Sequence, residues 1–308
     1  ANIMTRSLII FGQGAFRCHP YVLKEIQAVE EEDPNESLDQ FDQHFFDHIG
    51  YTLSNASRSF VRGITNKFTE SPVLDETANY YKEINRFSAA FALLTDVSML
   101  VLGGTLKRKE TISARLGDVL SSLYLASTSL KYYEDIGDKE ADLPLVHWTQ
   151  KTLLHEAQEN MHETLNNFPN KIVAVLLRCL IFPVGRNFSP PSIEETLTIG
   201  KLISRKTKTR ENLIMQGVYL KDEPTNHYAQ MNKALELYEI CYPIKKEIIK
   251  SKKKGLISGN TFSELTENAL QQGIINENQS GQLAEYADIA DEIINVDDFS
   301  QEEIDQIR

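Results

Sequence analysis

Residues 80–133 decide the fold, and they read YYKEINRFSAAFALLTDVSMLVLGGTLKRKETISARLGDVLSSLYLASTSLKYY. Small and apolar side chains recur three and four residues apart in both halves: Ile84, Phe87, Phe91, Leu94, Ser98 and Val101, then Ile112, Leu116, Val119, Leu123, Ala126, Leu130 and Tyr133. This spacing places them on one face of a helix. Gly103-Gly104 interrupts the pattern, and the charged residues 107–110 follow. The stretch predicts a long antiparallel helical hairpin with a heptad seam, each arm roughly 30–40 Å long at about 1.5 Å per residue.

Helical periodicity continues through the rest of the chain. Further helices are predicted at residues 1–11, 20–32, 38–68, 142–166, 171–182, 192–203, 228–254, 261–273 and 277–294. Asp142 is placed to cap one of them, and Ser192 and Thr261 begin Ser/Thr-x-x-Glu capping boxes. No segment shows the alternation and turn signals of a strand. The predicted fold class is therefore all-α, a helical bundle with long antiparallel helices and no significant sheet.

The bulk composition narrows the function classes. The chain has 308 residues and a formal net charge of −12, which disfavours binding to nucleic acid because phosphates are repelled. Its three cysteines, Cys18, Cys179 and Cys241, form no CxxC pair, so a disulfide framework or structural zinc site is not expected. No signal peptide is recognised, and the longest apolar run, residues 172–184, is too short to span a bilayer. A reducing, cytoplasmic location is predicted.

Two pairs of residues have the spacing of metal ligands. His44 and His48 are four residues apart, so one helix face could present two imidazoles. Glu159 and His162 form a Glu-x-x-His pair, which resembles half of a di-iron carboxylate site. Neither pair has further ligands nearby in the sequence, and a metal requires several that converge. We therefore predict no metal site and interpret both pairs as helix surface.

Two surface features leave alternatives open. Residues 171–182 are apolar nearly all round, which indicates either a core helix or an element that docks on a membrane or partner. A local basic patch is either solvated surface or a contact for anionic lipid or the phosphates of coenzyme A; it comprises Lys201, Arg205, Lys206, Lys208 and Arg210.

A family resemblance is carried by sequence blocks that occur in the family's order: 1–23 (ANIMTRSLIIFGQGAFRCHPYVL), 85–88, 94–99, 102–110, 112–118, 140–148, 167–170, 181–186 and 294–299. In these blocks the chain resembles the acyl-CoA dehydrogenases of bacterial fatty-acid degradation, the FadE type. The blocks span most of the chain. The resemblance implies a flavin-dependent enzyme of β-oxidation that binds FAD, an acyl-CoA substrate and an electron-transfer acceptor.

The resemblance also implies where the active site lies. The family's catalytic base is the glutamate of a Glu-Gly-Ala-Asn type motif, and Ala1-Asn2 correspond to its second half. The catalytic glutamate is then expected two positions before Ala1, and no catalytic residue is expected within the chain itself. Ala1, Asn2, Ile3 and Arg6 fall at flavin-contacting positions. Compared with the commoner family pattern, Ala1 lacks a threonine hydroxyl and Ile3 replaces an aspartate.

Three regions are expected on this basis. Residues 1–35 are the end of the dehydrogenase C-terminal helical bundle, residues 36–186 an added helical bundle, and residues 187–308 a helical tail region. The chain is expected to be an inactive part of a longer enzyme that serves assembly, acyl-chain accommodation or attachment to the inner membrane surface, in a homo-oligomer. The rival hypothesis is a non-catalytic, all-helical interaction module, since the sequence contains no complete active site.

Overall fold

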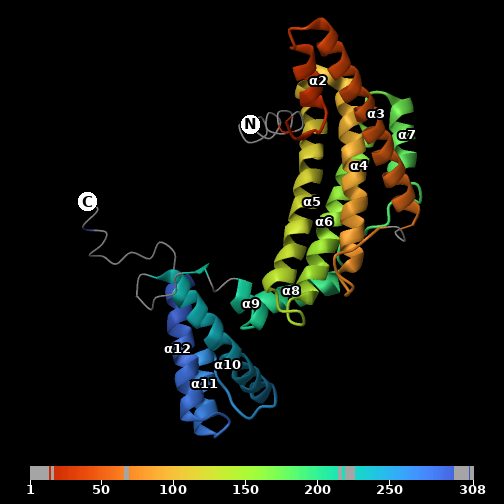
Figure 1. Cartoon of the computed structure of the whole chain (residues 1–308). Helices are drawn as coiled ribbons and strands as arrows, with labels where there is room; N and C mark the ends of the chain where they lie inside the picture. The colour runs from red at the N-terminus through yellow and green to blue at the C-terminus, as the bar shows by residue number, and fades with distance from the viewer. Residues whose placement is uncertain are drawn as a thin grey trace. The chain divides into compact units, whose positions relative to one another are not determined.

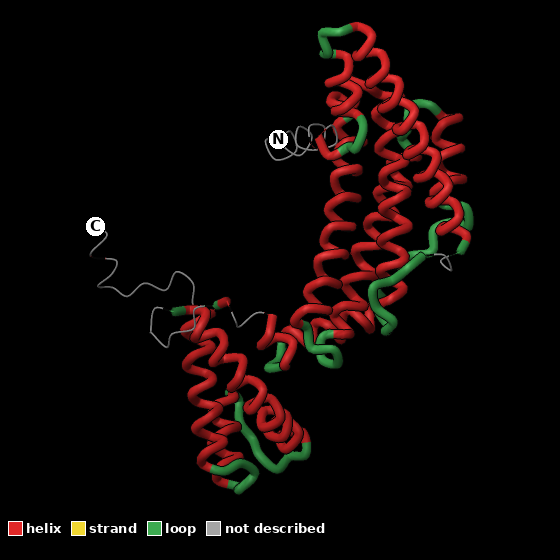
Figure 2. Tube along the Cα trace, in the orientation of Figure 1, coloured by secondary structure: helices red, strands yellow, loops and turns green. Residues whose placement is uncertain are grey.

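The fold is helical throughout the part of the chain that the structure describes. A computed structural model describes residues 14, 17–65, 69–213, 217–218, 226–294 and 305, and these residues form helices, turns and loops without a strand (Figure 2). The predicted all-α class is confirmed. The helices are α2 Val22–Val29, α3 Pro34–Ile64, α4 Ala78–Leu102, the 3₁₀ turn η2 Gly103–Arg108, α5 Glu110–Ile136, α6 Leu143–Asn166, α7 Lys171–Ile181, α8 Ile193–Ile203, α9 Lys208–Leu213, α10 His227–Lys253, α11 Phe262–Gln271 and α12 Glu277–Ile294 (Figure 1).

The chain divides into two compact units, Ala1–Thr196 and Leu197–Arg308. The predicted tail region begins ten residues earlier than the second unit, at residue 187. The three-region division stays a prediction.

The predicted hairpin is formed by α4, η2 and α5, which lie beside α6 in the first unit (Figure 1). All the predicted seam residues of α5 are buried, from Ile112 to Tyr133. In α4 the predicted seam residues are buried as far as Ser98 except Phe91, which is partly buried against the core; Val101 is exposed and Leu102 is buried in its place. Leu102 lies four residues after Ser98 and therefore on the same helix face. Gly103 then ends the helix with a positive φ of 49°. The heptad face of α5 packs more extensively on α6 than on α4.

The long helix α3 corrects the prediction for residues 38–68. It begins four residues earlier, because Pro34 occupies its first turn and the Asp33 carboxylate accepts hydrogen bonds from the backbone N–H groups of Asn35 and Glu36. The expected apolar face is largely exposed, at Phe45, Ile49, Leu53 and Phe60. The face that α3 buries is small and polar, at Asn55, Ser59 and Gly63.

Gly63 lies close to Pro183, and this contact gives a prediction about stability. A Cβ atom on Gly63 would lie 2.7 Å from Cγ of Pro183, whereas a Cβ on Gly50 of the same helix would meet nothing within 4 Å. We expect Gly63→Ala to lower the free energy of unfolding by about 1–3 kcal/mol, because the proline ring cannot move aside easily. Gly50→Ala is the matched control and should raise it by about 0.5–1 kcal/mol through helix propensity. Urea denaturation measures both values, and equal effects of the two substitutions would contradict this packing.

The starts of α6 and α8 differ in how far their caps follow the prediction. The Asp142 side chain does not cap α6; its Oδ2 instead accepts a hydrogen bond of 2.8 Å from the Asp138 backbone N–H. Ser192 and Glu195 do form the predicted capping box, since each backbone N–H donates to the other side chain, at 2.8 and 3.1 Å. Lys151 of α6 also donates to the Glu195 carboxylate.

These contacts predict an unusual titration of Glu195. The hydrogen bond from Lys151, followed by those at Ser192, lowers the pKa of Glu195 from 4.5 to about 2. A lowered carboxyl pKa stabilises the folded chain above pH 4.5, and this contribution is lost as the pH falls toward 2. NMR titration should find Glu195 half-protonated near pH 2, and Lys151→Met should move the midpoint back toward 4.5. An unchanged midpoint in that variant would show that Lys151 is not the cause.

The second unit contains a helical hairpin that matches its prediction. The helix α12 spans the predicted residues 277–294, Thr261 caps α11 by accepting from the Glu264 N–H, and Gly273, with a φ of 67°, ends the turn after α11. The buried core joins α10, α11 and α12 through Cys241, Ile244, Ile248, Ile257, Leu265, Ala269, Ile275 and Leu283.

Of the described helices, only the segment Ala78–Leu106 is long and apolar enough to cross a bilayer. Half of its most apolar window is buried in the protein, including Phe87 and Leu94 of the main core. A core helix of a soluble protein meets the same criteria of length and composition, so this is weak evidence for a membrane span.

Candidate functional site

The residues predicted to contact the flavin are Ala1, Asn2, Ile3 and Arg6, and they lie outside the described residues. No geometry toward FAD therefore follows from the structure. The described residues do show which contacts are made by the segment that follows, from residue 17 to the start of α2.

A polar cluster lies where the segment before α2 meets α3 and α4. It brings together His19, His48 of α3 and Asp96 of α4, each with one potential ligand atom within 4.8 Å of the others. Nε2 of His19 is 2.9 Å from Oδ1 of Asp96, and their side chains are only 7% and 5% exposed. The two imidazole rings lie 4.5 Å apart between centroids. We call these three residues the His19 cluster.

The ring of His19 is oriented by the start of α2. Its Nδ1 accepts hydrogen bonds from the backbone N–H groups of Tyr21 and Val22, at 3.2 and 3.1 Å. The N–H groups at a helix start have no partner within the helix, so this imidazole satisfies two of them. Because Nδ1 accepts, the ring carries its proton on Nε2, the nitrogen that faces Asp96.

The other two members of the His19 cluster also contact polar groups outside the cluster. Nδ1 of His48 lies 2.8 Å from Oε1 of Glu25 on α2. The Thr52 hydroxyl, one turn along α3 from His48, donates to Oδ2 of Asp96 at 3.2 Å. Each cluster member therefore has one polar atom engaged by a residue outside the cluster.

The two pairs of residues with the spacing of metal ligands, His44–His48 and Glu159–His162, have different surroundings in the structure. His48 joins the cluster, but His44, one turn before it, does not. Glu159 forms an ion pair of 2.7 Å with Arg186. Burial, and then the charges of Arg186 and Arg178, lower the pKa of His162. The Glu159–His162 pair thus lies in cationic surroundings on the helix surface.

Spacing along the sequence missed His19 and Asp96, because both are distant from His48 in the chain. One signal was available. Asp96 falls within the apolar stretch 91–102, where an acidic residue is unexpected unless it has a partner inside the protein. His19-Pro20, within the first resemblance block, could then have been considered as that partner.

The basic patch of the second unit is partly neutralised. Lys206 forms an ion pair of 3.0 Å with Glu236, and Arg210 contacts Glu211 at 3.4 Å and the Asn232 side chain at 3.0 Å. These partners support the interpretation of the patch as solvated protein surface.

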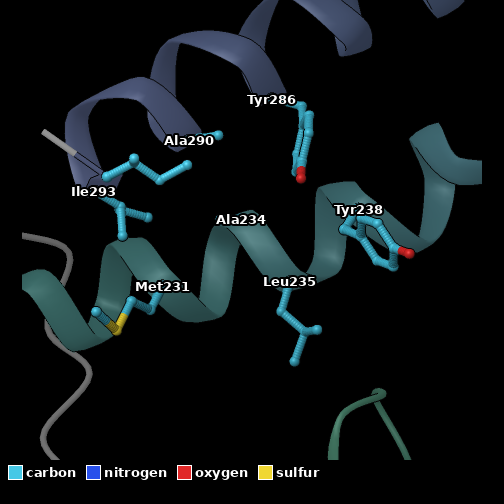
Figure 3. A pocket seen from close by; sticks show the side chains of 8 residues that line it. Met231, Ala234, Leu235, Tyr238, Tyr286, Ala290 and Ile293 are labelled. Atoms are coloured by element: carbon cyan, nitrogen blue, oxygen red, sulfur yellow. The ribbon is translucent and has the colours of Figure 1, made fainter. Parts of the chain in front are cut away.

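An open apolar groove of about 320 Å³ runs between α10 and α12 of the second unit (Figure 3). The rings of Tyr238 and Tyr286 lie across it with centroids 6.2 Å apart. Its walls are otherwise aliphatic, apart from the Met231 thioether, and comprise Met231, Ala234, Leu235, Tyr238, Tyr286, Ala290, Ile293 and Ile294. The groove offers mainly apolar contact, and the hydroxyls of Tyr238 and Tyr286 are the titratable groups among these residues.

The helices of the described residues, together with the resemblance blocks, define the class as an all-helical domain. Residues 16–299 match the family "Acyl-CoA dehydrogenase, C-terminal, bacterial type", and the chain belongs to that family. The predicted resemblance is confirmed. No solved structure matches the chain significantly.

Proposed function

We propose that this chain is the C-terminal helical portion of a flavin-dependent enzyme that oxidises fatty acyl-CoA to trans-2-enoyl-CoA in β-oxidation. The observation that carries the proposal is the family match over residues 16–299. The segment Ala1–Leu23 supports it, because it resembles the stretch that follows the catalytic glutamate in this family.

The proposed division of labour places the reaction near the N-terminal end of the chain. The glutamate expected two positions before Ala1 removes the α-proton of the thioester. The chemistry that FAD supplies when bound is acceptance of the β-hydrogen as hydride. In this proposal Ala1, Asn2, Ile3 and Arg6 contact the flavin and help to orient it against the substrate.

We propose assembly as the main role of the added helices. Phe45, Ile49, Leu53 and Phe60 form an exposed apolar stripe along α3. Exposed apolar stripes of this kind commonly mark contacts with other protein surfaces. A homo-oligomer, or docking of the preceding enzyme domains, would cover the stripe. Transfer of electrons to an acceptor and a cytoplasmic location at the inner membrane face are part of the same proposal.

The experiment compares two forms of the protein. The 308-residue chain alone should show no acyl-CoA oxidation, whereas a longer form that includes the preceding dehydrogenase segment should bind FAD and reduce it when acyl-CoA is added. Turnover by the 308-residue chain would refute the placement of the base. Failure of the longer form to bind FAD would favour the non-catalytic interaction module.

Substitutions in the helix α7 test the proposed membrane contact. Ile172, Val175 and Leu176 face outward, with Leu176 60% exposed, while Leu177 is 3% exposed and Leu180 packs partly against the core. We expect Leu176→Glu to leave the helix content and unfolding midpoint unchanged within about 0.5 kcal/mol and to weaken binding to anionic vesicles. Leu177→Glu is the matched contrast and should unfold the first unit, because it buries an unpaired charge. Sedimentation with vesicles measures binding, and a folded Leu176→Glu variant that sediments like the parent chain would exclude α7 as the lipid contact.

A further inference from the structure

We propose that the second unit pairs with the second unit of another copy of this chain, with the two α10 helices side by side and antiparallel. This pairing deepens the assembly role proposed above and rests on it. It involves only helices of the second unit, and neither FAD nor the acyl-CoA reaction takes part. The family match assigns no interface to these helices.

The helix α10 carries an apolar face that the second unit leaves exposed. Its core face is a different one, at Leu237, Cys241, Ile244, Ile248 and Ser251. The exposed face has side chains at alternating spacings of three and four residues, which is the seam of a coiled coil, and we call it the α10 seam: Tyr228, Met231, Leu235, Tyr238, Tyr242 and Ile249. Five of these are 42–71% exposed, and Leu235 is partly buried. An apolar stripe of this length is typical of a protein–protein contact.

The remaining positions of the same spacing are Lys245 and Lys252, and their charged ends are turned back onto their own unit. Nζ of Lys245 is 4.3 Å from the centroid of the Tyr286 ring. Nζ of Lys252 donates a hydrogen bond of 2.9 Å to the Gly259 carbonyl. The aliphatic stems of such lysines contribute apolar surface. The α10 seam therefore continues through the last turns of the helix.

The apolar groove between α10 and α12 lies along the N-terminal half of the α10 seam. Met231, Leu235 and Tyr238 belong to both the seam and the groove, while Ala290 and Ile293 of α12 line the opposite wall (Figure 3). A helix that lies along the seam therefore also fills the groove. This is the way an amphipathic helix commonly binds between two others.

The spacing of the seam fits an antiparallel pair. Met231 and Ile249 are equally far along the chain from residue 240. A twofold axis at that residue brings the partner subunit's Ile249 against Met231 and into the groove, and the partner subunit's Tyr242 against Tyr238. Both contacts occur twice, because the same surface is used by each copy, and such an interface closes as a dimer.

The charge distribution favours a second copy in this orientation. Residues 241–254 contain six lysines and one glutamate. The helix α12, which forms one wall of the groove, has five carboxylates and neither lysine nor arginine. Antiparallel pairing places the lysines of each copy beside the carboxylates of the other, whereas parallel pairing would bring like charges together.

Four of these charged side chains are available to a second copy. Lys246 and Lys253 flank the α10 seam and are exposed, as are Asp288 and Asp291 on α12. Within the described part of the chain, none of the four forms an ion pair. Opposite charges at the edge of an apolar contact fix its orientation and reject wrong pairings.

The first test measures the mass of the 308-residue chain by sedimentation equilibrium. We expect a dimer with a dissociation constant in roughly the micromolar range. Met231→Glu places a charge in the seam and the groove, and it should weaken the association at least about 100-fold. Ile240→Glu is the matched control, because Ile240 is 45% exposed on the opposite face of the same helix. It should change the dissociation constant by less than about 2-fold.

The second test reverses charges on two separate variants. One carries Lys246→Glu with Lys253→Glu, and the other carries Asp288→Lys with Asp291→Lys. Each variant alone should associate at least about 10-fold more weakly than the parent chain, because like charges then meet. An equimolar mixture of the two should associate to within about 3-fold of the parent, because opposite charges meet again. Circular dichroism checks that every variant is folded.

The proposal is overturned if the parent chain is a monomer at about 100 μM. It is equally overturned if Ile240→Glu weakens the association as much as Met231→Glu, if the charge-reversed variants dimerise like the parent, or if their mixture stays monomeric. None of these outcomes changes FAD binding by the longer form. A longer form that fails to bind FAD likewise leaves the mass of the 308-residue chain unchanged, so the two failures are distinguishable.

Discussion

Replacing Phe87 by alanine is expected to lower the free energy of unfolding of the first unit by about 3–5 kcal/mol. Phe87 is 0% exposed and lies in the main core of α4, where its ring centroid is 5.5 Å from that of Phe188. The Arg86 guanidinium lies 5.1 Å from the ring centroid as well. Truncation to alanine removes these contacts and leaves a cavity. The surrounding helices are packed against other helices as well, so they cannot readily move to close it.

The measurement must separate the two units, because each could unfold in its own transition. The chain contains one tryptophan, Trp148 in α6 of the first unit, so tryptophan fluorescence during urea denaturation monitors that unit. Leu100→Ala is the matched control, since Leu100 lies on the same helix and is 83% exposed. It should change the free energy of unfolding by less than about 0.5 kcal/mol. Similar losses from both substitutions would show that α4 is not buried on the Phe87 side.

The sequence predicted the core helices well where the apolar pattern is long and only one helix face is apolar. The seam of α5 from Ile112 to Tyr133 and the bounds of α12 follow directly from three- and four-residue spacing. The pattern fails at Val101, because the buried face continues from Ser98 to Leu102, four residues on, and not to Val101, three residues on.

The helix α3 shows what periodicity cannot decide. Its apolar residues recur with helical spacing, as at Phe45, Ile49 and Phe60, yet these side chains are exposed. The face with Asn55, Ser59 and Gly63 is buried instead, since small residues allow the close approach to Pro183. Spacing identifies an apolar face, but whether this unit or another surface covers it depends on packing partners that the pattern does not specify.

The His19 cluster could not be predicted from the sequence, for a related reason. Spacing detects ligands that share one helix, and it therefore selected His44 with His48. The structure draws the three residues of the cluster from the segment before α2, from α3 and from α4. Their proximity depends on the tertiary packing of these segments, and only the acidic residue Asp96 within an apolar stretch signalled that a buried partner exists.

The second large effect concerns the catalytic base of the proposed enzyme. Changing the glutamate expected two positions before Ala1 to glutamine is expected to lower kcat by at least about 100-fold, and by up to about 10,000-fold, because the amide cannot accept the α-proton. The side chains are nearly the same size, so FAD binding and the unfolding midpoint should be unchanged. Rapid mixing of the longer form with acyl-CoA, followed by the loss of the flavin's visible absorbance, isolates this step from later electron transfer.

The control is Glu30→Gln, which makes the same chemical change at an exposed position just after α2 and should leave the rate unchanged. The wild-type rate should rise with pH as the base loses its proton, whereas the residual rate of the glutamine variant should lack that dependence. A glutamine variant that binds FAD and reduces it at the parent rate would place the base elsewhere. It would also remove the reason for assigning Ala1, Asn2, Ile3 and Arg6 to the flavin site, because those assignments rest on the same alignment to the Glu-Gly-Ala-Asn motif.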